Sequence, residues 1–177
     1  MRQRLVIFSF LLMPIYACAT DAGHGHVRLH GNILDTACAI AVGDRNQTIN
    51  LGTVTISEVL HKKPEAAVSF RIHLINCTLQ RADAYRTHQA PWKNFHITFV
   101  SNHIDGNAFA NEGNASGEGI IIRDDEGHQA ISGEPLPDRK LTPGSMTLNY
   151  KIYLSANRIH IKPGKFQATI GYLMDYD

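Results

Sequence analysis

The chain of 177 residues is 44% apolar and carries 17 basic and 16 acidic residues, a formal net charge of +1. This length suits one domain, and the near-neutral charge gives no electrostatic reason to expect nucleic acid or an anionic membrane as the main partner. The composition also excludes a long coiled coil, a collagen and a largely disordered chain. No class of enzyme follows from these totals.

Residues 1–19 are predicted to be a secretory signal peptide. A basic start at Arg2 is followed by the apolar run 5–12, and an Ala-x-Ala cleavage site ends at Ala19. The apolar run is too short to span a membrane. In a competing interpretation, Cys18 is the acylated residue of a lipoprotein. Both interpretations predict an exported chain.

Removing this leader leaves two cysteines, Cys38 and Cys77. Two cysteines in an exported chain most simply form one disulfide, and they cannot complete a structural zinc site alone. The sequence therefore predicts a Cys38–Cys77 disulfide.

Alternation of apolar and polar residues predicts β-strands along most of the remaining chain, because alternate residues of a strand share one face. The segments with this pattern are 27–33, 49–51, 68–74, 95–99, 120–122, 146–154 and 166–176. Short strands separated by polar turns favour an all-β sandwich.

The segments between these strands contain turns and loops. Turn-forming clusters occupy 105–107, 126–127 and 142–144. A single helical turn is predicted over residues 56–60. Two polar stretches, 79–93 and 101–118, are predicted to be long surface loops.

Histidines suggest a metal site at one place. His24, His26 and His30 share a face of an extended segment, which would allow them to converge on a metal ion. The competing interpretation is that they form the outward face of a strand. The separate histidines are expected to be exposed or hydrogen-bonded; they are His61, His73, His96, His103 and His160.

Other candidate sites also have structural interpretations. The acidic run 124–126 is interpreted either as a calcium ligand set or as a solvated hairpin tip. Tyr85 and Trp92 are interpreted either as a recognition surface or as local packing. The chain has no Gly-x-Ser-x-Gly elbow, phosphate loop, zinc protease helix or dinucleotide fingerprint, so we expect it not to be an enzyme.

Both ends of the exported chain carry an unusual pattern. The N-terminal segment reads Gly23-His-Gly-His-Val-Arg-Leu-His-Gly31, and the last strand begins after Gly164 and ends at the penultimate Tyr176. Between them lie Ala37-Cys38, Gln47-Thr-Ile-Asn-Leu-Gly52 and Leu74-Ile-Asn-Cys77. In order and spacing, these residues resemble the pilin subunits of the chaperone–usher pathway, most closely those of type 1 and P pili, over residues 20–177.

This resemblance implies a fold and a domain organisation. Subunits of that family are immunoglobulin-like β-sandwiches that lack the seventh strand, which leaves an apolar groove. A chaperone strand fills the groove first, and the N-terminal extension of the next subunit then replaces it by donor-strand exchange. On this basis residues 1–19 are the signal peptide, 20–31 the donor-strand extension and 32–177 the pilin domain.

The resemblance also implies roles for particular residues. Val27 and Leu29 would enter a neighbour's groove, and Gly25 would face a shallow pocket. The acceptor groove would be bordered by residues 56–60 and by Met146, Leu148, Tyr150 and Ile152. The C-terminal strand would contact the chaperone through Gly164, Phe166, Ala168, Ile170, Tyr172, Met174, Tyr176 and Asp177.

The partners implied are a periplasmic chaperone, the outer-membrane usher and neighbouring pilins, with a host receptor reached only indirectly and no nucleic acid. No cofactor is expected. The chain would pass through the periplasm into a surface fimbrium as a major or minor shaft subunit, or as the subunit that terminates and anchors the fibre. The alternative is an exported sugar- or metal-binding sandwich that works alone.

Overall fold

The structure is a computed structural model that describes residues 25–31, 35–61, 67–81, 89–157 and 160–177. The chain divides into two compact units, residues 1–33 and 34–177. The predicted signal peptide lies outside the described residues. In the first unit, residues 25–31 form neither a helix nor a strand.

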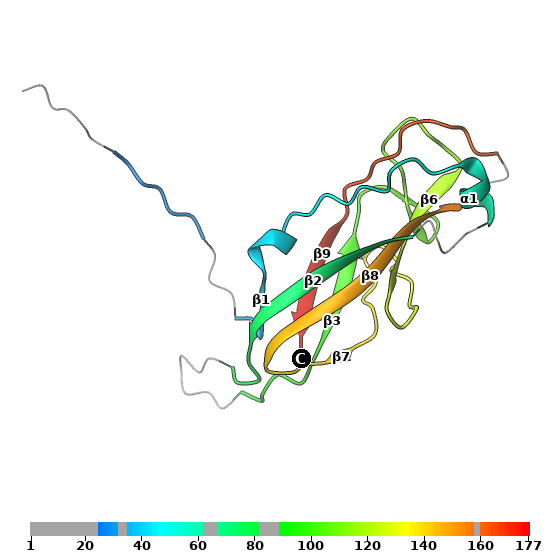
Figure 1. Ribbon diagram of the computed structural model, residues 1–177. Coiled ribbons are helices and arrows are strands. Elements are labelled where there is room, and N and C mark those ends of the chain that lie inside the picture. The colour runs from blue at the N-terminus through cyan, green and yellow to red at the C-terminus, as the bar shows by residue number, and fades with distance from the viewer. Residues whose placement is uncertain (1–24, 32–34, 62–66, 82–88, 158–159) are drawn as a thin grey trace, which may run out of the picture. The chain divides into compact units, whose positions relative to one another are not determined.

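The second unit is almost entirely β-structure (Figure 1). Its elements in chain order are β1 (Ala39–Ile40), η1 (Val42–Asp44), α1 (Ile56–His61), β2 (Val68–Cys77), β3 (Asn94–Val100), β4 (Ile104–Asp105), β5 (Ala108–Phe109), β6 (Glu118–Asp124), β7 (Arg139–Lys140), β8 (Gly144–Ala156) and β9 (Gly171–Tyr176).

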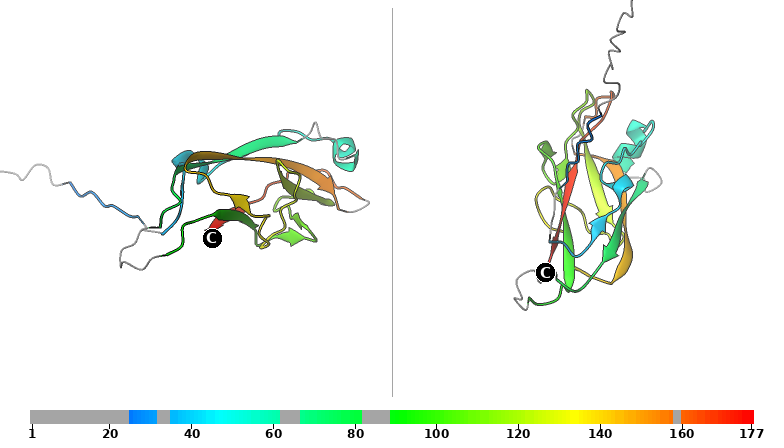
Figure 2. Two further views of the ribbon diagram at one scale, coloured as in Figure 1. Left: turned by 90° about the horizontal axis from the view of Figure 1, so that it is seen from below. Right: turned by 90° about the vertical axis from the view of Figure 1, so that its left-hand side faces the viewer.

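The strands form two antiparallel sheets. One has the order β1-β2-β8-β6-β5-β4, and the other has the order β7-β3-β9. The left view of Figure 2 shows β2 and β8 in one layer and β3 and β9 in the layer facing it. The predicted sandwich is therefore present, and its smaller sheet ends at β9.

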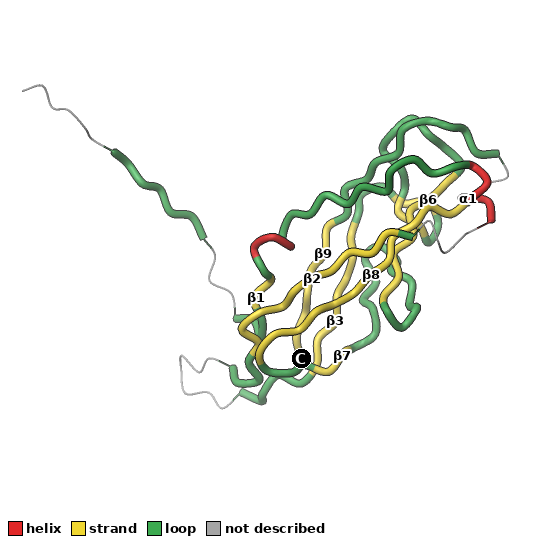
Figure 3. Tube along the Cα trace, viewed as in Figure 1, coloured by secondary structure: helices red, strands yellow, loops and turns green. Residues whose placement is uncertain are grey.

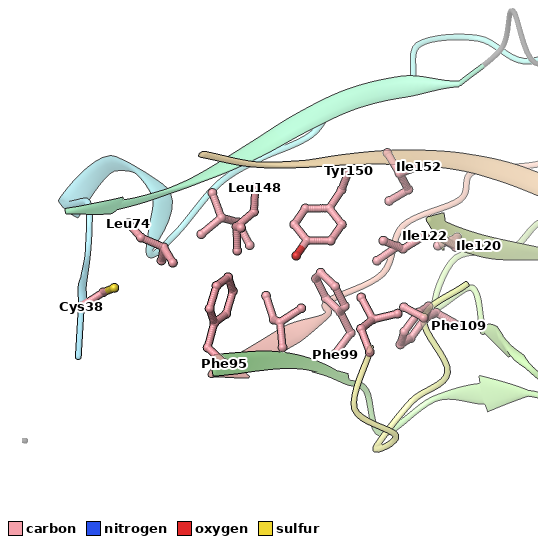
Figure 4. Packing of buried hydrophobic residues seen from close by; sticks show 14 of the residues in the cluster. Cys38, Leu74, Phe95, Phe99, Phe109, Ile120, Ile122, Leu148, Tyr150 and Ile152 are labelled. Carbon is pink, nitrogen blue, oxygen red and sulfur yellow. The ribbon is translucent and has the colours of Figure 1, made fainter. Parts of the chain in front are cut away.

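The core lies between these two layers. On β8, alternate side chains from Leu148 to Leu154 are buried, and on β3 both Phe95 and Phe99 are buried. The rings of Phe99 and Tyr150 meet edge to face, with centroids 5.2 Å apart, as Figure 4 shows. The alternation of apolar and polar residues in the sequence thus gives each sheet one apolar face.

A disulfide joins Cys38, just before β1, to Cys77 at the end of β2. Near this end, the β2–β8 register shifts between Leu74 and Cys77, and Asn76 has a φ of 55°. Asparagine tolerates this left-handed conformation better than most residues. The predicted disulfide is confirmed.

The short helix α1 begins at a capping box. The Thr55 N–H donates to Glu58 Oε2 at 2.7 Å, and the Glu58 N–H donates to Thr55 Oγ1 at 3.3 Å. These two bonds satisfy N–H groups that a helix start leaves unpaired. The predicted helical turn is confirmed, and α1 extends to His61.

The strands predicted at 68–74, 95–99, 120–122 and 146–154 are confirmed. The stretch 101–118, predicted to be a long surface loop, also contains a short hairpin of β4 and β5, and the Phe109 side chain in it is fully buried. Residues 49–51 and 166–170 carry strand-like alternation without joining a regular ladder. The other predicted loop, 79–93, is described only in part.

Candidate functional site

An open groove runs along one side of the sandwich, with a volume of about 1140 Å³. One rim is formed by residues 44–54 and the other by residues 161–172. The floor is apolar and comes from both sheets: Phe70, Phe99, Ile120, Ile122, Ile152 and Leu154. Figure 3 shows most of both rims as loop, because neither takes part there in a regular ladder.

The 161–172 rim presents backbone groups to the groove. The carbonyls of Lys165 and Gln167 accept bonds from the backbone of Ala115 and Glu112, at 3.0 and 2.8 Å. Because backbone groups alternate in direction along an extended chain, those of Phe166 and its alternate neighbours point the opposite way. On that side, the described residues supply no backbone partner.

The strand β9 continues this edge. Asn94 and Asp177 exchange two backbone hydrogen bonds, at 3.2 and 3.1 Å. Because backbone groups alternate in direction, the N–H and C=O groups of Asp175, Leu173 and Gly171 also point toward β3. The backbone groups of the residues between them face away from β3, at the edge of the sheet. Residues 166–176 therefore form one long edge that is suited to pairing with an added strand.

The 44–54 rim turns its apolar side chains toward the core. Ile49, Leu51 and Val54 are half-buried and pack against the core cluster. The side chain of Gln47 ties this rim to β2, donating from Nε2 to the Arg71 carbonyl at 2.7 Å. This rim is therefore attached to β2 of the larger sheet, whereas the opposite rim pairs with residues 112–116 and joins the smaller sheet only where β9 begins.

Gly164 is required by a close approach at one end of the groove. A Cβ at this position would lie 2.6 Å from Asn114 Oδ1 and 2.7 Å from the Ala115 nitrogen. Only glycine lets residues 161–165 pass so near the 114–115 backbone.

Glu118 is a buried carboxylate beside the apolar floor of the groove. This residue is 6% exposed, and its Oε1 accepts a 3.0 Å bond from Asn111 Nδ2. The Asn111 carbonyl oxygen Oδ1 in turn accepts from the Gln167 N–H at 2.9 Å. Glu118 could not be found from the sequence, since an isolated carboxylate before an apolar run forms no recognisable motif.

The predicted donor residues lie in the N-terminal segment, residues 25–31. Val27 and Leu29 are 87% and 88% exposed, and Gly25 has open space around it. Large apolar side chains with this exposure, alternating in an extended segment, are typical of a strand that binds elsewhere.

The predicted groove residues fall in two places. Ile152 lines the groove. Leu148 and Tyr150 are each 1% exposed in the closed part of the core, where β3 covers them, and Met146 is half-buried beside them. Of the predicted bordering segment, Ile56 and Val59 line the groove.

The predicted C-terminal strand residues lie along one edge. The apolar residues at even positions from Phe166 to Tyr176 are half-buried and pack against the core, whereas the odd positions are exposed. The Asp177 carbonyl accepts a backbone bond from Lys93 at 2.6 Å. The sequence pattern thus corresponds to an edge with one apolar face.

Several histidines lie beside carboxylates. His73 Nδ1 lies 2.7 Å from Asp44, and His96 Nδ1 lies 3.2 Å from Asp138. Within the described part of the chain, no three metal-binding side chains gather. His24, one member of the proposed metal set, lies outside the described residues.

The acidic turn and the tryptophan have structural roles. Asp124 accepts bonds from the backbone of Glu126 and His128 at 3.0 and 2.7 Å, which shapes the hairpin tip. Trp92 is 5% exposed, and the Arg81 guanidinium lies 3.5 Å from its ring centroid. Both residues are held by local packing; Tyr85 lies outside the described residues.

Fold and groove together define a β-sandwich subunit that is open along one side. The chain belongs to the fimbrial protein family, which it matches over residues 27–177. It is 32% identical to the major MR/P fimbria protein of Proteus mirabilis, over 90% of this chain and 88% of that protein. It is 27% identical to the fimbria A protein of Serratia marcescens, over 90% and 88% of the two chains.

Solved structures agree in fold. A chaperone–usher pilus structure that explains rod uncoiling superposes with a TM-score of 0.68 at 19% identity, covering 91% of this chain and all of that chain. The P pilus rod subunit PapA gives 0.63 at 18% identity, covering 80% and 100%. The predicted resemblance to pilin subunits and the all-β immunoglobulin-like fold are therefore confirmed.

Fimbrial proteins form pili at the cell surface. None of the helices that the structure describes has the length and apolar character needed to cross a membrane.

Proposed function

We propose that this chain is a structural subunit of a chaperone–usher pilus and polymerises by donor-strand exchange. The observation that carries the proposal is the groove, which has an apolar floor between two rims. An added strand there would complete the sandwich by pairing with the backbone edge at residues 166–176.

The N-terminal segment supplies the chemistry that such a groove needs. Val27 and Leu29 share one face, whereas His26, Arg28 and His30 share the other. Burying the two apolar side chains in a neighbouring subunit would contribute about 1.5–3 kcal/mol each. A ladder of backbone hydrogen bonds adds to this, so contacts between subunits dissociate slowly.

Before assembly, the same groove needs a temporary partner, because an open apolar edge favours aggregation. We propose a periplasmic chaperone in that role. It pairs with the C-terminal strand edge from Gly164 to Asp177 and is displaced at an outer-membrane usher. The finished fibre lies on the cell surface, and we infer a structural role without catalysis.

The open groove supports a place within the shaft. A shaft subunit must accept one donor segment and supply another, whereas a terminating subunit needs a groove that accepts none. Both requirements of a shaft subunit are matched by the groove and by the N-terminal segment. The chain's relatives include a major fimbria protein and a minor pilin protein, so the proposal covers a major or a minor shaft subunit.

The test compares two double variants in the same segment. Val27→Asp with Leu29→Asp places charges on the face proposed to enter the groove. Arg28→Ser with His30→Ser changes the opposite face and serves as the matched control. We expect the first variant to bind its chaperone normally but to fail to join the subunit ahead, and the control to assemble.

Assembly is measured as heat-labile, detergent-resistant oligomers in the presence of chaperone and usher. If both variants assemble, or if both fail equally, the alternating apolar face is not the donor. A self-sufficient sandwich would give a closed monomer whose stability neither variant changes.

A further inference from the structure

The floor of the groove changes from apolar to polar along its length. Three residues of β6 and their partners on β8 follow one another there: Ile122 with Ile152, Ile120 with Leu154, and Glu118 with Ala156. Because alternate residues of a strand share one face, the three β6 side chains line the groove in succession. Ile120, Ile122 and Ile152 are labelled in Figure 4. The floor therefore has two aliphatic levels and then a carboxylate.

One oxygen of this carboxylate has no partner. Glu118 Oε1 accepts from Asn111 Nδ2 at 3.0 Å, and the Glu118 backbone carbonyl accepts from Asn157 Nδ2 at 3.3 Å. Glu118 Oε2 is buried and makes no hydrogen bond within the part of the chain that the structure describes. A buried acceptor without a partner costs free energy, so a donor group placed in the groove would relieve that cost.

The carboxylate is also fixed in position. Asn111 Oδ1 accepts from the backbone N–H groups of Gly113 and Gln167, at 2.7 and 2.9 Å. Asn111 Nδ2 donates to the Ala115 carbonyl at 2.9 Å as well as to Glu118. Since Asn111 is bonded at both ends of its amide, it holds Oε1 in place, and Oε2 keeps its position beside the start of the 166–176 edge.

The direction of an added strand follows from the sheets. Every ladder between the described strands is antiparallel. A strand added antiparallel to the 166–176 edge would place its C-terminal residues where that edge begins. Asn111 joins Glu118 to Gln167, so the Glu118 carboxylate lies at this end.

The inward face of the N-terminal segment matches the floor level by level. Phe70 pairs with Tyr150, one level before Ile152, and its ring lies against that of Phe99. The residues that share the inward face of the segment are, in order, Gly25, Val27, Leu29 and Gly31. With the valine and the leucine on the two aliphatic levels, the first glycine lies beside the aromatic rings and the second lies over Glu118. Neither glycine has a side chain that would meet the groups below it.

We propose that Glu118 is a specificity-determining residue of the groove. It admits glycine or a hydroxyl-bearing side chain over its free oxygen, and it disfavours an apolar side chain, which would bury that oxygen without a partner. The occupant is the N-terminal segment of a second copy of this chain, with Gly31 over Glu118. The inference rests on the proposed function, because Glu118 selects a strand only if the groove accepts one.

The experiment measures the binding of peptides of residues 23–33 to the full chain carrying Val27→Asp and Leu29→Asp, whose own segment does not compete. Gly31→Thr and Gly31→Val give side chains of the same shape, of which only threonine has a hydroxyl. We expect the threonine peptide to bind about tenfold more tightly, because its hydroxyl donates to Oε2. A neutral probe is used because Lys162 and Lys165 line the same end and would repel a cation.

The matched control makes the same two substitutions at the other glycine. Gly25→Thr and Gly25→Val peptides should bind the chain equally, because no carboxylate lies at the aromatic level of the floor. A preference for threonine at both positions, or at neither, would overturn the role of Glu118. A preference at position 25 alone would overturn the placement of Gly31.

Variants of the acceptor chain assign the preference to the carboxylate. In Glu118→Leu, the valine peptide should bind at least as tightly as the threonine peptide. Glu118→Gln keeps an oxygen for Asn111, and its preference should fall to about threefold, since a neutral hydrogen bond is about half as strong as one to a carboxylate. A tenfold preference that persists in Glu118→Leu overturns the inference; if that variant does not fold, an unchanged preference in Glu118→Gln does so.

The unsubstituted peptide separates this inference from the proposed function. If it does not bind the chain with intact Glu118, the proposed function itself fails. If it binds, and the preference between threonine and valine does not depend on Glu118, only the selection by Glu118 is overturned.

Discussion

At the scale of single residues, Asp124 organises the turn after β6. Its side chain is 5% exposed, and His128 Nδ1 lies 2.9 Å from its Oδ2. Burial raises the pKa of Asp124, but hydrogen bonds from His128 and Glu126 outweigh it, so the pKa lies below its ordinary value. The ionised carboxylate is therefore more stable in the folded chain than in the unfolded chain.

We expect Asp124→Asn to lower the free energy of unfolding by about 1–3 kcal/mol at pH 7, because the charged acceptor is lost. A group with a lowered pKa contributes its full stability above the unfolded pKa of about 3.9 and loses it as the pH falls through the folded pKa. The difference in the free energy of unfolding between the variant and the parent should therefore shrink below about pH 4.

Urea unfolding at pH 7 and pH 3 measures this difference. Asp125→Asn is the control, since Asp125 is partly exposed and pairs with Arg139 at the surface. If Asp124→Asn lowers the free energy of unfolding by the same amount at both pH values, the assigned role of the Asp124 carboxylate is contradicted.

At the scale of elements, the disulfide ties the start of β1 to the end of β2. Cys38 and Cys77 are 5% and 6% exposed and are separated by 39 residues in sequence. Closing a loop of this length restricts the unfolded chain. Because β1 has only two residues, its ladder with β2 holds it weakly. The disulfide therefore helps to hold β1 in place.

We expect Cys38→Ser with Cys77→Ser to lower the free energy of unfolding by about 3–4 kcal/mol, from the loop-closure entropy. Chemical denaturation measures the loss, and the parent chain under reducing conditions should match the double variant. An unchanged midpoint after reduction would show that the bond adds no stability.

The elements also show how far sequence reasoning reaches. Strands β2, β3 and β8 were predictable because apolar residues alternate along them, β6 because of its short apolar run 120–122, and the disulfide because only two cysteines remain. The groove was harder to locate. Alternation indicates that Tyr150 and Ile152 point inward, but not that β3 covers the first and leaves the second in the open groove.

The two rims could not be predicted for a related reason. Residues 44–54 and 161–170 have apolar alternation but no regular partner, and their pairing depends on side chains such as Asn111 and Gln47. The Tyr172 hydroxyl, for example, donates a hydrogen bond to the Asp44 carbonyl oxygen, which lies 128 positions away in the sequence. No local sequence pattern predicts such a contact. The segments at the two chain ends that resemble pilins are local patterns, so they could be recognised in the sequence.

At the scale of the whole molecule, a chain with an unfilled groove should gain stability from a strand supplied in solution. The peptide of residues 25–31 would bind the folded state and not the unfolded one, which at a hundred times its dissociation constant stabilises by about 2.7 kcal/mol. For a domain of this size the melting temperature should rise by about 5–10 °C.

Thermal unfolding of the Val27→Asp, Leu29→Asp chain measures this shift. The matched control peptide is Gly-His-Val-Leu-Arg-His-Gly, which keeps the composition but places valine and leucine on opposite faces of a strand. It should raise the melting temperature by much less. Because only the alternation differs between the peptides, equal shifts would mean that the groove does not recognise a strand with one apolar face.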